Sequence, residues 1–301
     1  GKSIVERSYI SLKEEFTGQK VPIYAPTDMT LIQGSHYKNP AAQMNSLPDY
    51  ALKFDSGCGV EITLGHLKEV VEPIASQLRE VKPDSRENQL NRINFKPGDL
   101  VGYFIYNPED VSGFDFVARD KKFINGFINQ KRYENGRATN LINGVCPYDF
   151  YKGDKKETYY ALLGGAGGTL FKIKDCGSAS RDVPGTISGM WFLSEEIGNT
   201  IYEDYKEGDY GSPISLMGDE ESVSIGNLGQ TPISRIYSTN PTYKLPAEVT
   251  TEHCYQIYPN MNDAQGYAYF KIIDESTINA YYSSTGKCPK SMPEGGKRYY
   301  K

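Results

Sequence analysis

The stretch that decides the fold is Gly65-His66-Leu67, followed along the chain by Phe95-Lys96-Pro97-Gly98-Asp99-Leu100-Val101-Gly102 and then by Gly113-Phe114-Asp115-Phe116-Val117. In the second piece, Gly98 permits the positive φ that a tight turn between extended segments requires. The pieces therefore predict β-strands joined by short turns.

The composition of the whole chain also favours a mainly β protein. Its 301 residues are enough for two domains, each with a core of its own. The sequence contains 24 tyrosines and 30 glycines, and its many short runs of alternating apolar and polar residues are typical of strands with abundant turns. The net charge of −5 gives no electrostatic footprint for nucleic acid or an anionic membrane. No apolar run approaches the roughly 20 residues of a transmembrane helix.

The opening pieces resemble the core of the LytM/lysostaphin-type (LasA-like) zinc metallopeptidases, which cut peptidoglycan cross-bridges. Val21 to Leu31 is similar to the strand that opens the family's domain, and Val60 to Leu67 resembles the strand that ends in its "tyr-x-his-leu". Phe95 to Gly102 matches the family's "gly-asp" turn, and residues 113–116 fall where the family has "his-leu-his-phe". The resemblance implies a barrel-sandwich, peptidase-like domain over residues 1–120.

The zinc ligands of that family are mostly missing. A catalytic zinc needs three protein ligands and an open position for water. The family supplies a histidine, an aspartate four residues later and the second histidine of H-x-H, but no histidine precedes Val21 here. Gly113 and Asp115 stand at the two H-x-H positions, and Asp115 alone could still bind metal. The sequence thus predicts a peptidase scaffold without stoichiometric zinc, other cofactors or the family's catalysis.

The remaining candidate site consists of His36, His66 and Asp115. His66 is either a functional residue, which transfers protons or binds an unusual metal, or a histidine kept for packing and a backbone hydrogen bond at a strand end. The second interpretation is favoured because no partner metal or nucleophile is visible. His36 is expected in a polar, turn-rich loop. The predicted function is binding of a peptide, glycan or cell-envelope partner in a cleft lined by His66, Asp115 and the loop 36–49. The alternative is a metal-dependent hydrolase with substituted ligands.

Two segments depart from the β pattern. Apolar residues recur every three or four positions from His66 to Val81, which predicts an amphipathic helix interrupted awkwardly by Pro73. Residues 121–176 are predicted to connect two domains, with a glycine hinge at 164–168 before a strand at 169–173. A phosphate-binding loop is disfavoured because no Gly-Lys-Ser/Thr follows those glycines.

Residues 177–301 are expected to form a second domain, an antiparallel β-barrel or sandwich. The segment Asp182 to Phe192 contains the only tryptophan, Trp191, and resembles the "gly-x-trp" strand of small calycin-like barrels. The same segment beside a LytM-like domain resembles uncharacterised peptidase-like bacterial proteins. Further strands are predicted at 222–225, 253–258, 267–273 and 277–282.

The five cysteines favour an exported protein. The sequence predicts the pairs Cys146–Cys176 and Cys254–Cys288, with Cys58 as a free thiol in a hairpin turn. The alternative is five reduced cysteines in a cytosolic protein. Because the chain begins at Gly1 without methionine, a targeting segment is expected to have been removed. The predicted location is extracellular or in the cell envelope.

Overall fold

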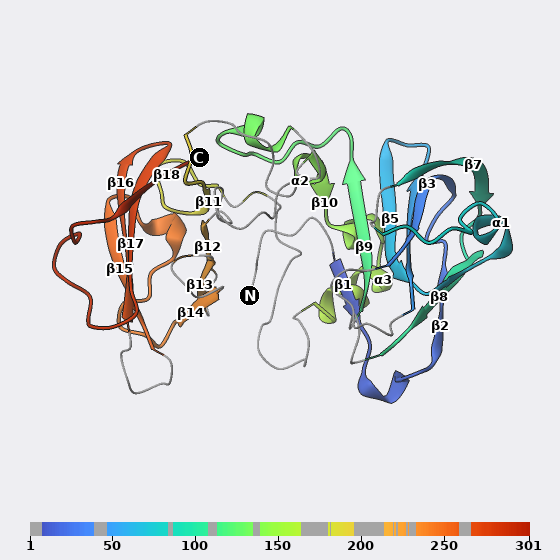
Figure 1. Cartoon of the computed structure of the whole chain (residues 1–301), viewed down its shortest axis with the longest axis horizontal. Helices are drawn as coiled ribbons and strands as arrows, with labels where there is room; N and C mark the ends of the chain where they lie inside the picture. The colour runs from blue at the N-terminus through green and yellow to red at the C-terminus, as the bar shows by residue number, and fades with distance from the viewer. Residues whose placement is uncertain are drawn as a thin grey trace. The chain divides into compact units, whose positions relative to one another are not determined.

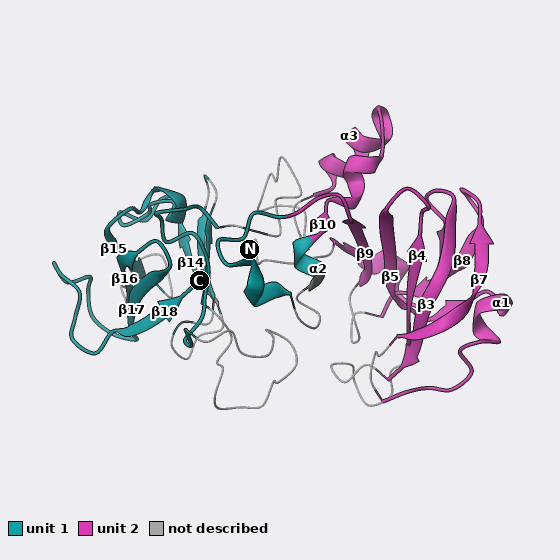
Figure 2. Ribbon diagram, turned by 90° about the horizontal axis from the view of Figure 1, so that it is seen from above, with its two compact units in different colours: residues 1–5, 125–142, 177–301 teal, residues 6–124, 143–176 magenta. Residues whose placement is uncertain are grey.

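The computed structural model describes residues 8–38, 47–83, 87–107, 113–134, 139–163, 180, 182–195, 214–218, 220, 222–226, 228, 233–258 and 266–301. The chain divides into two compact units, which Figure 2 distinguishes by colour. The N-terminal unit comprises Glu6–Ile124 and Asn143–Cys176, and the C-terminal unit comprises Gly1–Val5, Asn125–Ile142 and Gly177–Lys301. The segment 121–176, predicted as a connector, is therefore divided between the two units.

The N-terminal unit is built on a seven-stranded antiparallel sheet (Figure 1). Its strands are β1 (Ser8–Ser11), β3 (Met29–Tyr37), β4 (Asp49–Asp55), β5 (Val60–Leu67), β7 (Asn88–Phe95), β9 (Gly113–Asp120) and β10 (Gly144–Val145). The strand order is β1-β9-β5-β4-β3-β7, and β10 also pairs with β9. Alternate residues of β5, including Ile62 and Leu64, are buried, so one face of the sheet is covered by the core.

A smaller sheet of three strands belongs to the same unit. It contains β2 (Lys20–Tyr24), β8 (Leu100–Ile105) and β6 (Glu69–Val70), in the order β2-β8-β6. Ile23, Val101 and Phe104 join the core of the large sheet. The turn that leads into β8 confirms the role predicted for Gly98, whose φ is +89°.

The helices and 3-10 turns of this unit are short. They are η1 (Glu14–Phe16), α1 (Glu72–Ala75), η4 (Pro147–Phe150) and α3 (Asp154–Ala161). No helix among the described residues is long and apolar enough to cross a membrane.

The prediction of a helix from His66 to Val81 was wrong. His66 has a φ of +63°, which a right-handed helix cannot contain, and the backbone N–H of Lys68 donates to the Tyr103 carbonyl at 2.9 Å. Only the single turn of α1 is helical, and Pro73 stands in its first turn, where a missing N–H costs no helical hydrogen bond. The apolar spacing of three and four arises from a strand end followed by a turn, with Ile74 and Leu78 reaching the same core.

The C-terminal unit contains two four-stranded antiparallel sheets. The first consists of β11 (Gly189–Trp191), β12 (Ile214–Gly218), β13 (Ser222–Gly226) and β14 (Ile233–Tyr237), and the second of β15 (Glu252–Ile257), β16 (Gly266–Asp274), β17 (Thr277–Ser283) and β18 (Lys297–Tyr300). Three short elements accompany them: η2 (Gln130–Tyr133), α2 (Thr139–Ile142) and η5 (Pro246–Glu248). The strands predicted near 222, 253, 267 and 277 are confirmed.

One core is shared by these two sheets. Trp191 and Leu216 enter it from the first sheet, and Tyr255 and Phe270 enter it from the second. An antiparallel bridge between Phe192 and Tyr300 connects the sheet edges. The strands described in this unit form no closed barrel. Trp191 therefore packs between two open sheets and does not plug the end of a calycin-like barrel.

The cysteines agree in part with the predicted pairing. Cys254 and Cys288 form a disulfide, as predicted, and Cys58 is free and exposed. Cys146 is also disulfide-bonded. Cys176, its predicted partner, lies outside the described residues, as do the glycine cluster 164–168 and the strand predicted at 169–173.

Candidate functional site

Two groups of side chains in the N-terminal unit could carry a function, and they lie on opposite faces of β9. Phe114 and Phe116 line a cavity, whereas Asp115, between them in sequence, approaches His66. Successive residues of a strand point to opposite faces of its sheet. The cavity and the histidine cluster are thus separate sites.

His66 is positioned by a β-bulge. Tyr50 pairs with Leu67 and Leu52 with Leu64, so Gly65 and His66 together stand opposite a single residue of β4. The positive φ of His66 is strained for a residue with a side chain. The bulge turns the imidazole toward two carboxylates. Its Nδ1 is 2.7 Å from Asp49 Oδ2, and its Nε2 is 3.5 Å from Asp115 Oδ2.

Asp49 holds this cluster together. Its buried carboxylate accepts a hydrogen bond from His66 and another, at 2.6 Å, from the buried ammonium group of Lys68. Burial raises the pKa of Asp49, but the hydrogen bonds and charges of His66 and Lys68 outweigh it and leave that pKa below its usual value. The cluster therefore fixes the orientation of the imidazole through Asp49.

The residues of this cluster do not fit the zinc site of the LytM-type peptidases. His66 and Asp115 could offer one nitrogen and one carboxylate, but Gly113, at the other H-x-H position, has no side chain. Among the described residues no group of three His, Cys, Asp or Glu side chains could hold a metal ion. Three protein ligands are the ordinary requirement of catalytic zinc.

The sequence suggested that His36 lies in a loop. The structure instead places it near the end of strand β3. Its ring stacks on Tyr50 with centroids 4.0 Å apart, and its Nδ1 is 2.9 Å from the Leu78 carbonyl oxygen. The loop was predicted from the polar and turn-forming residues 34–40, but Gly34 and Ser35 belong to the same strand as His36. Residues 39–46 of the predicted binding loop lie outside the described part of the chain.

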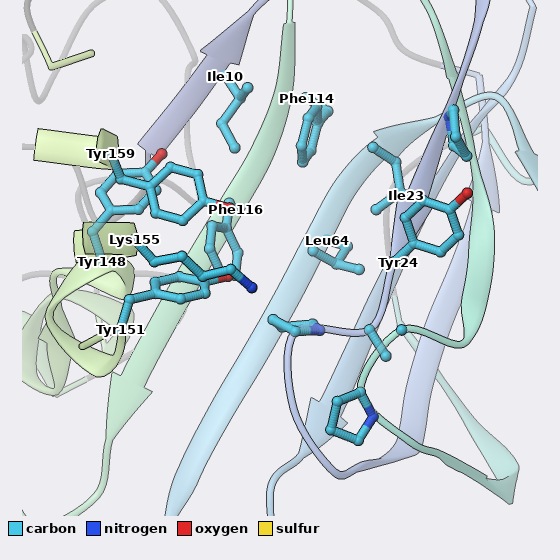
Figure 3. Close-up of a pocket in the computed structure, with 15 residues that line it drawn as sticks. Ile10, Ile23, Tyr24, Leu64, Phe114, Phe116, Tyr148, Tyr151, Lys155 and Tyr159 are labelled. Atoms are coloured by element: carbon cyan, nitrogen blue, oxygen red, sulfur yellow. The ribbon is translucent and has the colours of Figure 1, made fainter. Parts of the chain in front are cut away.

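The cavity on the other face of β9 has a volume of about 560 Å³ and is walled mainly by aromatic and apolar side chains (Figure 3). The floor includes Leu64, Phe114 and Phe116 from the large sheet, and one wall comes from Ile23 and Tyr24 of β2. The remaining lining residues are Ile10, Pro22, Ala25, Pro26, Pro97, Gly98, Tyr148, Tyr151, Lys155 and Tyr159. This volume lies within the range of small-ligand and peptide side-chain pockets.

Three tyrosines form the wall opposite β2, as Figure 3 shows. Tyr148 and Tyr151 are three residues apart across η4, and Tyr159 lies on α3. The Tyr159 ring stacks on Tyr148 with centroids 5.3 Å apart and lies 4.7 Å from Tyr151. Burial, with smaller effects of the neighbouring tyrosines, raises the pKa of Tyr151 to about 12. Its phenol therefore stays protonated at neutral pH.

Sequence reasoning missed this cavity. The motif Cys146-Pro147-Tyr148-Asp149-Phe150-Tyr151 gave a partial signal, because Pro147 starts a short turn and residues at i and i+3 of a 3-10 turn share one side. Lys155 and Tyr159, four residues apart on α3, also share a face. What no local pattern reveals is that β2, β9 and α3 meet around one space.

The cluster of Asp49, His66 and Lys68 predicts how the stability of the N-terminal unit changes at acidic pH. The folded pKa of Asp49 is depressed, so its contribution to stability is fully present above its unfolded pKa of about 3.9 and is lost as pH falls through the folded pKa. We expect the unfolding midpoint in urea to be constant near neutral pH and to fall below about pH 4. Hydrogen exchange of β4 and β5, measured by mass spectrometry, would report this loss locally.

The control for this prediction is an exposed pair in the same unit. Asp49→Asn should destabilise the unit by about 3 kcal/mol at pH 7, because it removes the buried negative charge that lies 2.6 Å from the buried Lys68 ammonium group. Asp28→Asn, which removes an exposed partner of Lys96, should change stability by less than about 1 kcal/mol. Equal effects of the two substitutions would contradict the stabilising role that we assign to the buried Asp49 carboxylate.

No protein-family model, curated protein or solved structure matches this chain.

Proposed function

We propose that the N-terminal unit is a non-catalytic binding module that holds an extended peptide in the tyrosine-lined cavity. The observation that supports this proposal is the cavity itself, with three tyrosines on one wall and the β2 residues Ile23 and Tyr24 on the other. Tyrosine rings offer large apolar faces with a polar tip, which suits contact with peptide side chains. We include in this proposal that the unit has the LytM-type fold that the resemblance in the sequence suggests.

The position of β2 favours an extended peptide. β2 is at the edge of its three-stranded sheet and pairs with β8 on one side. Edge strands are where an added peptide strand can form backbone hydrogen bonds. Pro22 within β2 has no N–H, as is usual for proline on an edge strand, so an added peptide would gain fewer hydrogen bonds there. Most of the binding energy would then come from side chains that enter the cavity.

The chemistry of the lining residues favours a peptide over a glycan. The described wall offers phenol groups and one ammonium group, Lys155, but no carboxylate, carboxamide or guanidinium group. Sugar hydroxyls need several such planar donors and acceptors, whereas apolar and proline side chains need none. The exposed Lys155 suits a carboxylate next to the apolar anchor. The proposed ligand is therefore an extended peptide with proline or another apolar residue beside an acidic residue.

A titration tests this proposal. A fluorescent ten-residue peptide of alternating proline and leucine with one glutamate is expected to bind, and Tyr159→Ala to weaken binding at least tenfold, because it removes a ring that stacks on Tyr148. The matched control is Phe150→Ala, since Phe150 lies on η4, is exposed and does not line the cavity. Chitotetraose serves as the sugar probe. Binding of chitotetraose without binding of the peptide, or equal effects of the two variants, would contradict the proposal.

The proposed location is outside the cytoplasm. The Cys254–Cys288 disulfide and the disulfide state of Cys146 support it, because such bonds persist in oxidising compartments. A thiol titration that finds all five cysteines reduced in protein from its native source would reject this part of the proposal.

A second candidate function, hydrolysis, has one observation in its favour. His66 combines a strained φ with a carboxylate on each side, and strained residues cluster at active sites. If the protein hydrolyses peptidoglycan peptides, His66→Ala should abolish that activity while Tyr159→Ala affects it little. Absence of hydrolysis by the wild-type protein would leave binding as the function of this unit.

A further inference from the structure

The C-terminal unit contains a buried lysine and aspartate that face each other in its interior. Lys301 Nζ is 3.9 Å from Asp182 Oδ1, and the two side chains are 1% and 3% exposed. Lys301 Nζ also donates a hydrogen bond to the Ser188 carbonyl at 2.8 Å and lies 4.4 Å from the centroid of the Trp191 ring. The amine is thus held at one position beside the carboxyl group and shielded from water.

The two oxygens of Asp182 have different surroundings. Oδ2 accepts a hydrogen bond from the backbone N–H of Ile128 at 2.9 Å, and the N–H of Met190 also interacts with the carboxyl group. Oδ1 is buried and accepts no hydrogen bond from the described residues. A buried carboxylate oxygen that accepts no hydrogen bond is costly, and most native structures avoid it.

Gly189 allows this arrangement. Its φ of +121° lies in the region that favours glycine, and a Cβ at this position would be 1.9 Å from Asp182 Oδ1. The backbone thus passes directly over the carboxyl group, on the side of the oxygen that lacks a hydrogen bond. Asp182 is confined by Gly189 on one side and held by Ile128 on the other.

We propose that Lys301 and Asp182 condense into an intramolecular amide. The ammonium group of Lys301 first gives a proton to Asp182 Oδ1, which leaves an amine and a carboxylic acid. The amine lone pair then attacks Cγ, one C–N bond forms, and negative charge develops on Oδ2. The C–Oδ1 bond breaks as the hydroxyl group takes a second proton from Nζ and leaves as water. No oxidant, reductant or other reactant is needed.

The surroundings support both halves of this reaction. The Ile128 N–H, which already binds Oδ2, would stabilise the oxyanion of the tetrahedral intermediate. Burial lowers the pKa of Lys301 to about 8, although Asp182 opposes this, and burial raises the pKa of Asp182. Both shifts favour the neutral amine and the neutral acid from which an amide forms. Burial holds the amine 3.9 Å from Oδ1, and this fixed placement beside the carboxyl group supplies a proximity that the reaction in solution lacks.

The mass of the intact protein tests the proposal directly. After reduction of its disulfides, the folded wild-type protein is expected to be lighter than its sequence by one water. Trypsin cleaves after Arg181 and Arg298, so fragment spectra should contain a branched peptide that joins residues 182–206 to residues 299–301. A wild-type mass equal to the sequence mass, with the two peptides recovered separately, would overturn the proposal.

Three variants exclude other sources of a lost water. Lys301→Arg keeps the charge but removes the nucleophilic amine, so its mass should equal that of its sequence. Asp182→Asn should lose ammonia instead of water if it reacts, because the leaving group changes. Lys297→Arg, at an exposed residue of β18, should retain the loss of one water. Since the deciding measurement is made on the wild-type protein, a variant that fails to fold leaves the test intact.

Discussion

Gly102→Ala is expected to destabilise the N-terminal unit by about 3 kcal/mol or more, a large part of the 5–15 kcal/mol typical of a folded domain. Gly102 lies on β8 opposite Val70 of β6. A Cβ added there would be 2.3 Å from the Glu69 carbonyl oxygen and 3.1 Å from the Val70 Cα. Both atoms belong to the backbone, so no side chain can move aside, and β6 would have to separate from β8.

The substitution isolates this steric effect. The φ of Gly102 is not among the positive values, so alanine can adopt the same backbone conformation. Urea unfolding followed by circular dichroism, together with hydrogen exchange of residues 68–71 and 100–105, would measure the loss. Gly126→Ala, in the C-terminal unit, is the control for a glycine-to-alanine change without a steric clash, because a Cβ at that position has no atom within 4 Å and the change should be nearly neutral for both units. A Gly102→Ala midpoint within error of wild type would show that β6 and β8 can separate at little cost.

The strands of this protein were predictable where local signals agreed. Short alternating runs located β13 and the three strands β15 to β17, because side-chain direction repeats every two residues in any strand, whereas β5 was expected from the resemblance of Val60 to Leu67 to a peptidase strand. Gly98 was predicted correctly for an equally local reason, since a tight turn there needs a positive φ. The Cys254–Cys288 pair followed from its position at the ends of the last strands.

The errors arose where tertiary contacts override local patterns. The spacing of apolar residues from His66 to Val81 fits a helix, but backbone pairing between β6 and β8 removes that option. His36 was assigned to a loop by its polar neighbours, yet the pairing of β3 with β4 extends through it to Tyr37. The tyrosine cavity was missed because its walls come from segments that are distant in sequence.

The residues around His66 were also only partly predictable from local sequence patterns. His66 and Asp115 were expected together from the resemblance to a peptidase core, and the structure places them 3.5 Å apart. Asp49 and Lys68, which orient His66, were not predicted, because a buried ion pair leaves no periodic signal in the sequence. A lysine two residues after a histidine is ordinary until the facing aspartate is known.

Trp191→Ala should be the most damaging substitution in the C-terminal unit, with an expected loss of about 3–5 kcal/mol. The side chain is fully buried in the core shared by the two sheets, and its Nε1–H donates to the Ile187 carbonyl at 2.8 Å. Alanine would leave a cavity between the sheets and a buried carbonyl oxygen without its donor. It would also remove the ring over which Lys301 Nζ lies.

Trp191→Phe separates packing from these polar contacts. Phenylalanine retains an aromatic face but lacks the N–H, so a loss of about 1–2 kcal/mol is expected from the hydrogen bond and a small cavity. Because both variants remove the only tryptophan, unfolding must be followed by circular dichroism and by hydrogen exchange of β12 and β16. A loss of about 3 kcal/mol or more for Trp191→Ala with a smaller loss for Trp191→Phe would show that ring packing dominates. Equal losses would instead assign the main role to the indole N–H, and a small loss for both would contradict a core organised around Trp191.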